Sequence, residues 1–312
     1  MIPLVGGIYS SLLGQLIVII PVLVNVAFIT LLERKILGLR QLRKGPNKVS
    51  VLGLLQPFRD AIKLFSKELL LPLMSNQKQF LVGPFMALGL VITVFIAIPF
   101  HESLFNIRIG FIFIYIVLSL NVFPIIIRGW ASNSKYALIG RARAIAQTIS
   151  YEVRFAVLII FVLILSLGIR TSIILLSNNW WSNVLLFAPL AGIIFISSLA
   201  ETNRTPFDFA EGESELVSGF NIEYGGVGFA IIFIAEYARI LFIRCVISFM
   251  FLSGRLGLRY VYIFITRLVG AWVWARTTFP RFRYDKLMSL TWKAFLPISI
   301  LILAQPILLS SL

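Results

Sequence analysis

Residues that bind metals and haem are almost absent from this chain. It has one cysteine, Cys245, and one histidine, His101, in 312 residues. Iron–sulfur clusters need several thiolates, and haem needs well-placed axial ligands. We therefore expect this chain to bind no metal ion, haem or iron–sulfur cluster. Cys245 stands in an apolar segment, where packing is the expected role of a thiol.

Charged residues are also scarce, and acidic ones most of all. Only 13% of the residues are charged, whereas 59% are hydrophobic, and the mean hydropathy is +0.95. Soluble domains have about 45–50% apolar residues. Because this excess is gathered into long blocks, the sequence predicts an integral membrane protein that forms a single membrane domain over residues 1–312.

The apolar blocks are long enough to cross a bilayer, which takes about 20 helical residues each. They are apolar throughout, without the alternation of barrel strands, so the fold class is all-α. The sequence predicts about eight transmembrane helices, near residues 12–32, 80–100, 109–127, 145–168, 184–200, 226–252, 257–275 and 294–312.

The distribution of lysine and arginine predicts the orientation. The first, third and seventh loops are rich in both, whereas the second and fourth have only Arg108 and Arg170. By the positive-inside rule, the odd-numbered loops face the cytoplasm or an organelle matrix, and both termini face the other side. The net charge of +15 thus reflects topology and contacts with lipid or partner proteins, and we expect no binding of nucleic acid.

The first loop contains an amphipathic segment. After the turn signal Lys44–Asn47, apolar residues from Val51 to Phe65 recur at helical spacing, with Arg59 and Lys63 on the opposite face. This pattern predicts a helix that lies in the membrane interface. Periodicity alone leaves open the alternative that the helix only covers neighbouring spans.

The fifth loop is unusually acidic. Six of the thirteen acidic residues of the chain fall within residues 201–223. A solvated acidic loop is the simplest explanation. A divalent cation site is disfavoured, because the spacing matches no known ligand loop. These six residues are Glu201, Asp208, Glu211, Glu213, Glu215 and Glu223.

Three glutamates stand at membrane depth. Glu152 lies inside the fourth predicted span, Glu201 at the end of the fifth and Glu236 inside the sixth. Ionisable groups in such places are costly and usually line a polar path. Burial and neighbouring carboxylates both favour the protonated acid, so such groups can load and release protons. We expect a proton relay through these three, with Glu211, Glu213 and Glu215 at its mouth.

Several long motifs resemble those of one family, the quinone-site membrane subunit of respiratory complex I, a proton-pumping NADH:ubiquinone oxidoreductase. The resemblance runs from about residue 20 to residue 298. The motifs are LERK (Leu32–Lys35), RKGPNK (Arg43–Lys48), QPF and DAIKL (within Gln56–Leu64), GWASNSKY (Gly129–Tyr136), AQTISYEV (Ala146–Val153), LAETNRTPFD (Leu199–Asp208, continuing to Gly219) and PRFRYD (Pro280–Asp285).

The resemblance implies an eight-helix subunit that forms much of a ubiquinone chamber, with the last iron–sulfur cluster held by another subunit. It implies that ubiquinone is a substrate and that this chain binds no flavin. Glu152, Glu201 and Glu236 match the family's acidic channel, which leads from the chamber toward antiporter-like subunits. The residues that match its chamber positions are Arg34, Asp60, Arg204, Phe233 and Arg283.

The same resemblance implies partners, activity and location. The partners are the peripheral-arm quinone-module subunits, the antiporter-like membrane subunits and lipids, and the isolated chain is expected to be inactive. The 27 phenylalanines and the lack of a targeting segment favour the mitochondrial inner membrane, with odd loops in the matrix and termini in the intermembrane space. Two alternatives are a subunit of a membrane-bound hydrogenase, disfavoured by the complete first-loop motifs, and a free-standing ion transporter.

Five arginines depart from the family pattern, which has small or weakly polar residues there. An unpaired arginine within a span costs at least about 2.5 kcal/mol. One explanation is that Arg154 and Arg239 pair with Glu152 and Glu236. The other is that AGA and AGG codons, which some invertebrate mitochondrial codes read as serine, have been translated as arginine. The five positions are Arg59, Arg128, Arg154, Arg239 and Arg244.

Overall fold

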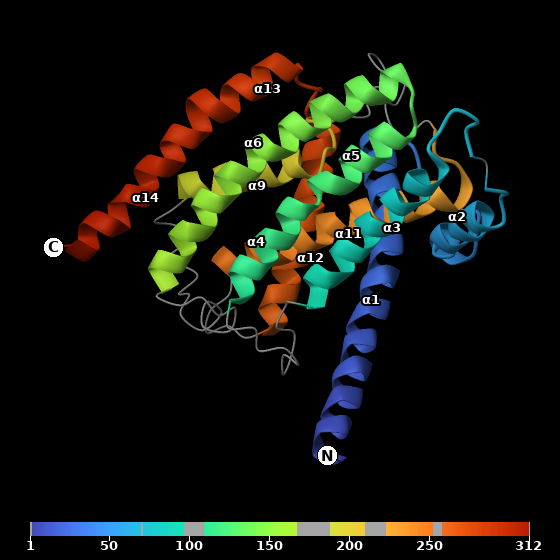
Figure 1. Ribbon diagram of the computed structural model, residues 1–312, viewed down its shortest axis with the longest axis horizontal. Coiled ribbons are helices and arrows are strands. Elements are labelled where there is room, and N and C mark those ends of the chain that lie inside the picture. The colour runs from blue at the N-terminus through green and yellow to red at the C-terminus, as the bar shows by residue number, and fades with distance from the viewer. Residues whose placement is uncertain are drawn as a thin grey trace.

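The chain folds into a bundle of helices (Figure 1). The computed structural model describes residues 2–69, 71–96, 109–166, 188–209, 223–251 and 258–311. No strand occurs among these residues, which confirms the all-α class. The helices are α1 (Ile2–Arg40), α2 (Gln56–Phe65), α3 (Gln77–Ile96), α4 (Gly110–Leu120), α5 (Val122–Ala131), α6 (Lys135–Ser166), α9 (Ala188–Glu201), α11 (Gly226–Phe251), α12 (Leu258–Thr278), α13 (Tyr284–Leu290) and α14 (Leu296–Ser311).

Among the described residues, five segments are long and apolar enough to cross a membrane, and a shorter apolar helix covers Pro189–Glu201. Helices α11 and α12 correspond to the sixth and seventh predicted spans, and the described part of each of the eight predicted blocks is mainly helical. The total of about eight crossings stays a prediction. The five segments are Ile17–Arg40, Gln77–Phe95, Gly110–Ala131, Lys135–Ile164 and Tyr284–Gln305.

The third of these segments is interrupted at Asn121, which ends α4 and precedes α5. Pro124 has no backbone N–H to donate to the carbonyl of Leu120, so the helical hydrogen-bond ladder cannot run through unbroken. The Asn121 side chain compensates in part, because its Nδ2 donates to the carbonyl of Val117 at 3.3 Å. The two helices therefore follow each other closely and act as one span.

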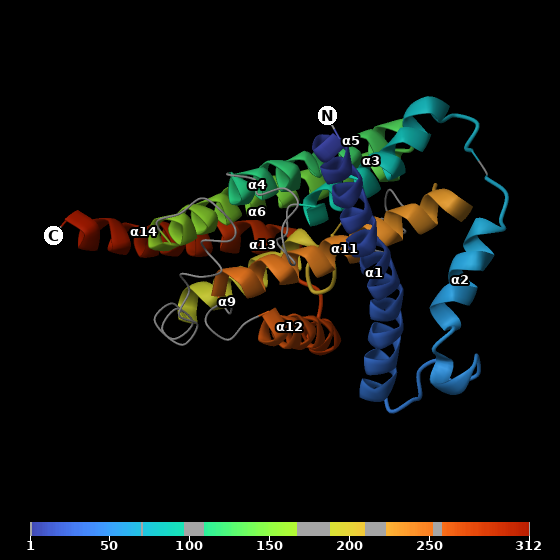
Figure 2. The same cartoon turned by 90° about the horizontal axis from the view of Figure 1, so that it is seen from below.

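Helix α11 lies at the centre of the bundle and contacts α1, α2, α3, α9 and α12 (Figures 1 and 2). Its side chains Ile240 and Ile243 are fully buried, together with Leu158 of α6, Ile194 of α9 and Val273 of α12. In contrast, α1 and α14 reach away from the other helices toward the two chain ends (Figure 1). Their outer faces expose large apolar residues, as a surface in contact with lipid does.

The amphipathic segment forms a short 3₁₀ turn, Val51–Gly53, followed by α2 at the edge of the bundle (Figure 2). Gly53 has a φ of +76°, and a Cβ there would collide with the Pro46 carbonyl, so the turn at Lys44–Asn47 packs closely against it. Ile62 is 69% exposed and Phe65 52%. Because the bundle leaves this apolar face uncovered, the interfacial interpretation is favoured over mere coverage of neighbouring spans.

A buried glutamine fixes the turn that follows α9. Gln147 of α6 is fully buried, and its Nε2 donates to the carbonyls of Ala200 at 2.8 Å and Phe207 at 2.9 Å. Phe207 in turn stacks on Phe282, whose backbone N–H donates to the carbonyl of Pro206 at 3.0 Å. These contacts hold the turn between α6 and the segment before α13.

Substituting Gln147 tests this anchor. The Gln147→Ala variant loses two hydrogen bonds, which together contribute about 1–3 kcal/mol. We expect a lower midpoint of thermal unfolding for the protein in detergent, measured by intrinsic fluorescence. The control is Gln79→Ala, at an exposed position of α3. Equal midpoints for the two variants would contradict the assigned role of Gln147.

Candidate functional site

Arg34 and Asp60, both predicted to line a quinone chamber, form an ion pair. Arg34 Nη1 lies 2.5 Å from Asp60 Oδ2, and Gln56 Nε2 donates to Asp60 Oδ1 at 2.9 Å. The pair joins the end of α1 to α2, and the Arg34 side chain remains about half exposed. A guanidinium at this position is therefore partly available to another anion.

Arg204, in the turn after α9, connects the two predicted sets of residues. Its Nη2 lies 2.7 Å from Glu236 Oε2 of α11, and its guanidinium lies 5.2 Å from the ring centroids of both Phe233 and Tyr237. Arg204 is buried. The structure thus brings Arg204 and Phe233, two predicted chamber residues, into contact with the predicted relay residue Glu236.

Glu201, at the end of α9, pairs with Arg239 of α11, with Arg239 Nη2 3.2 Å from Glu201 Oε1. Glu152 of α6 interacts electrostatically with both of them, and its Oε1 is buried without a hydrogen-bond partner. Glu152 and Glu201 therefore lie near each other, as a relay requires.

The explanation that Arg154 and Arg239 pair with Glu152 and Glu236 is wrong. Glu236 pairs with Arg204 rather than with Arg239, which pairs with Glu201. Arg154 forms no ion pair with Glu152 among the described residues, and its guanidinium lies against aromatic rings instead. Residues two apart on a helix do not face each other, so the Arg154–Glu152 pair was unfavourable from the start.

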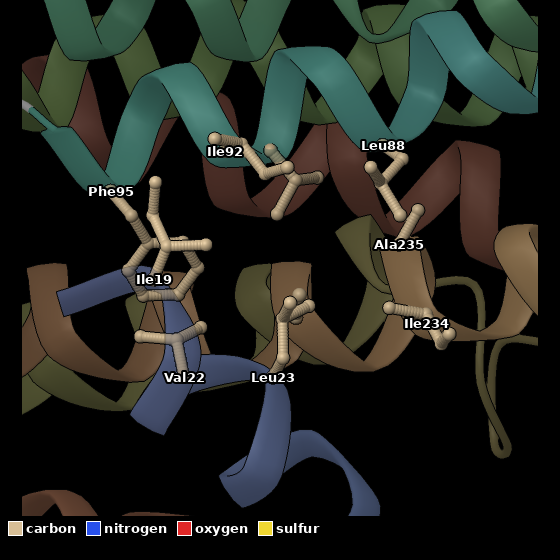
Figure 3. A pocket seen from close by; sticks show the side chains of 10 residues that line it. Ile19, Val22, Leu23, Leu88, Ile92, Phe95, Ile234 and Ala235 are labelled. Carbon is tan, nitrogen blue, oxygen red and sulfur yellow. The ribbon is translucent and has the colours of Figure 1, made fainter. Parts of the chain in front are cut away.

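Two cavities lie on opposite sides of the contact between α3 and α11. The first, between α1, α3 and α11, has a volume of about 10 Å³ and only apolar walls (Figure 3). The second, about 30 Å³, is lined by Asn121, Arg128, Glu236 and Arg239 among others. Ala235 lines both. A cavity with polar walls favours water, whereas a small apolar cavity excludes it. The apolar residues between the two cavities therefore separate a cavity suited to water from a dry one.

An ion pair that sequence analysis missed lies between α1 and α12. Arg276 pairs with Glu33, whose Oε2 also accepts a 2.7 Å hydrogen bond from the Tyr237 hydroxyl. Arg276 Nε donates to Thr205 Oγ1 at 3.0 Å. Glu33 is buried. Its position near the end of a predicted span, like that of Glu201, was the available signal, whereas Arg276 lies just after the seventh predicted span, in a loop rich in lysine and arginine.

These contacts form one series of polar groups across the bundle. Glu33 bonds to Tyr237, whose ring contacts Arg204, and Arg204 pairs with Glu236. Glu236 shares the polar cavity with Arg239. Arg239 pairs with Glu201, and Glu201 interacts with Glu152. A path of ionisable groups thus runs from α1 through α11 to α6.

Arg283, the remaining predicted chamber residue, lies apart from this series. It precedes α13 and is exposed, and its Nε lies 3.0 Å from the exposed Asp285. No contact joins it to Arg34 or Arg204 within the described part of the chain. The predicted relay mouth, Glu211, Glu213 and Glu215, lies outside the described residues. In the parts of the chain that the structure describes, no group of His, Cys, Asp or Glu is placed to hold a metal ion.

Comparison with known proteins identifies the family. The family model for NADH dehydrogenase matches residues 13–305. The chain belongs to the NADH dehydrogenase family. Curated relatives named NADH-ubiquinone oxidoreductase chain 1 include one from Aedes aegypti, 48% identical over 93% of both chains. Another, from Monodelphis domestica, is 46% identical over 96% of this chain and 98% of the relative. The resemblance found in the sequence motifs is therefore confirmed.

The buried ion pair between Arg276 and Glu33 leads to a prediction about the stability of this NADH dehydrogenase family member. In Arg276→Met, Glu33 keeps Tyr237 but loses its cation, and breaking a buried pair from one side costs about 3–5 kcal/mol. We expect a sharp drop in the amount of assembled protein on a native gel and in the thermal midpoint. Arg283→Met breaks an exposed pair, worth at most about 1 kcal/mol. Comparable losses in both variants would contradict the argument.

Proposed function

We propose that this chain is a core membrane subunit of proton-translocating NADH:ubiquinone oxidoreductase, complex I. In this proposal it forms much of the ubiquinone chamber and the acidic channel that couples quinone reduction to proton pumping. It is an enzyme only as part of that assembly. Family membership supports the assignment, and the observation that carries the coupling role is the contact of Arg204 with both Phe233 and Glu236.

The quinone chamber is assigned to Arg34, Asp60, Arg204, Phe233 and Arg283. Two-electron reduction of a quinone builds negative charge on its oxygens, which then take up two protons. Cationic groups aimed at that charge stabilise it. Arg34 suits this task because it is held in place by Asp60 yet half exposed. The electrons come from a cluster in another subunit, so this chain binds and orients the quinone and stabilises its charge.

The proton path is assigned to Glu152, Glu201 and Glu236, with Glu211, Glu213 and Glu215 at its mouth. Arg204 forms an ion pair with Glu236. A negative charge that arises beside Phe233 attracts the same guanidinium, which weakens this ion pair and frees Glu236 to take part in proton transfer. A proton then passes by way of the polar cavity toward Glu201 and Glu152. Quinone chemistry would thus act on the path electrostatically.

Location and partners complete the proposal. We place the chain in the mitochondrial inner membrane, with odd loops in the matrix and termini in the intermembrane space. Its partners are the quinone-module subunits of the peripheral arm, the antiporter-like membrane subunits and lipids. The uncovered apolar face of α2 supports contact with lipid or another subunit.

Removing the acids tests the proton path. In complex I carrying Glu152→Gln and Glu201→Gln together, the amides cannot exchange protons as carboxylates do. We expect pumping by reconstituted vesicles, measured with a pH-sensitive dye during NADH oxidation, to fall at least about tenfold, equivalent to about 1.4 kcal/mol. Glu68→Gln, at an exposed site, is the control. Undiminished quinone reduction and pumping in the double variant would overturn the relay.

Removing a chamber cation tests the quinone site. Arg34→Met should lower ubiquinone reduction by about tenfold, since an interaction of about 1.4 kcal/mol with the developing charge is lost. NADH oxidation with a water-soluble artificial acceptor, which bypasses the quinone site, should stay at the parent rate. The control is Arg40→Met, at the exposed end of α1. Parent-level ubiquinone reduction in Arg34→Met would remove Arg34 from the chamber.

A further inference from the structure

Arg154 of α6 is a buried cation without a counter-ion at contact distance among the described residues. Its exposed fraction is 0%, and its guanidinium forms no ion pair with a carboxylate among the described residues. The guanidinium carbon lies 4.3 Å from the ring centroid of Tyr151 and 4.9 Å from that of Phe295. Aromatic faces attract cations, and the Tyr151 side chain interacts with the guanidinium, but one hydroxyl can neither satisfy five N–H donors nor neutralise the charge.

Arg244 of α11 is in a similar position. It is also 0% exposed, and within the described residues its Nη1 donates to the Ser198 hydroxyl while Nε and Nη2 have no hydrogen-bond partner. Ser198 is neutral, so the buried charge has no counter-ion at contact distance within the described residues. By comparison, the buried Arg204 pairs with Glu236.

Neither lipid nor a partner subunit supplies what is missing. Both side chains have no exposed surface in the folded chain, so a lipid or partner subunit that binds the outside does not reach their guanidinium groups. A buried charge without a partner is among the costliest features a protein interior can have. Two such charges in one small bundle oppose folding, and they also oppose insertion into the membrane.

We infer that the protein made in the mitochondrion carries serine at positions 154 and 244. In several invertebrate mitochondrial genetic codes AGA and AGG specify serine, so these codons appear as arginine when the standard code is applied. The inference rests on the mitochondrial location in the proposed function, but its test reads mass rather than activity. Arg239, which pairs with Glu201, and the exposed Arg59 are not subject to this burial argument.

Serine fits both sites, as neighbouring residues demonstrate. The buried Ser150, Ser197 and Ser248 each donate to a carbonyl three or four residues earlier in their own helix, at 2.6, 2.8 and 2.7 Å. A serine in these helices is therefore satisfied without any outside partner. Serine at 154 and 244 would have the same carbonyls within reach.

The substitution also changes the proton path. Arg154 and Arg244 both interact electrostatically with Glu201, and without them that carboxylate loses two cationic neighbours. The space left by a guanidinium holds on the order of one or two waters, each taking about 30 Å³. Beside position 154 such a water would meet the buried Tyr151 hydroxyl, which then no longer has the Arg154 guanidinium beside it. Serine at position 154 thus leaves room for water, whereas arginine fills that space with a fixed positive charge.

Mass spectrometry of the native complex decides the question. Complex I is purified from mitochondria of the source organism, and its peptides are sequenced after digestion with trypsin and, separately, chymotrypsin. Trypsin cuts after arginine, so serine at 154 gives a peptide that runs uncut from residue 144 past 154, whereas arginine gives one that ends there. Cleavage after Arg143, on the same helix, is the internal control.

Each outcome bears on the inference. Serine at both positions supports it, and the intact mass of the chain then falls by the corresponding difference. Arginine, or any residue other than serine, at either position overturns it. The codons give an independent check with matched controls: AGA or AGG at 154 and 244, against CGN at the paired Arg34, Arg204 and Arg276, is the expected pattern. A CGN codon at 154 or 244 also overturns it.

Discussion

Charge buried among apolar helices constrains this protein more than any other feature. Hydrocarbon offers no hydrogen bonds, so each buried ion must find its partner inside the protein. Glu33, Glu201 and Glu236 each pair with an arginine from another element, α12, α11 and the turn after α9 respectively. These pairs cross-link the bundle around α11. The contacts that hold the helices together are thus also the ones that form the proposed path.

The position of α11 follows from this constraint. Around Ala235 the helix packs closely on α3, with a dry cavity on one side and a polar one on the other. On the polar side, Glu236 and Arg239 lie about one helical turn apart and both line the polar cavity. In the proposed mechanism, a charge that arises near Phe233 acts on Glu236 through Arg204, which contacts both, while the apolar cavity excludes water.

Much of the fold could be predicted from the sequence, because hydrophobic blocks report directly on where a chain can lie in lipid. The described part of each predicted block is mainly helical, but α6 begins at Lys135, ten residues before the predicted span. Its polar first turns have no hydropathy signal. The sequence also singled out Glu152, Glu201 and Glu236, since an acid within an apolar block stands out, and their role as a proton relay stays a proposal. Their partners were not found, since helix spacing says nothing about which residue approaches from another helix.

The sequence alone determined the membrane class, the helices, the family and the identity of the acids at membrane depth, because these depend on composition and local order along the chain. Only the tertiary structure decided that Arg204 rather than Arg239 pairs with Glu236, that Glu33 is held by Arg276 and Tyr237, and that Arg154 and Arg244 are enclosed without a counter-ion at contact distance. Such facts depend on which helices meet and at what rotation. That is fixed by the packing of the whole bundle and not by any single segment.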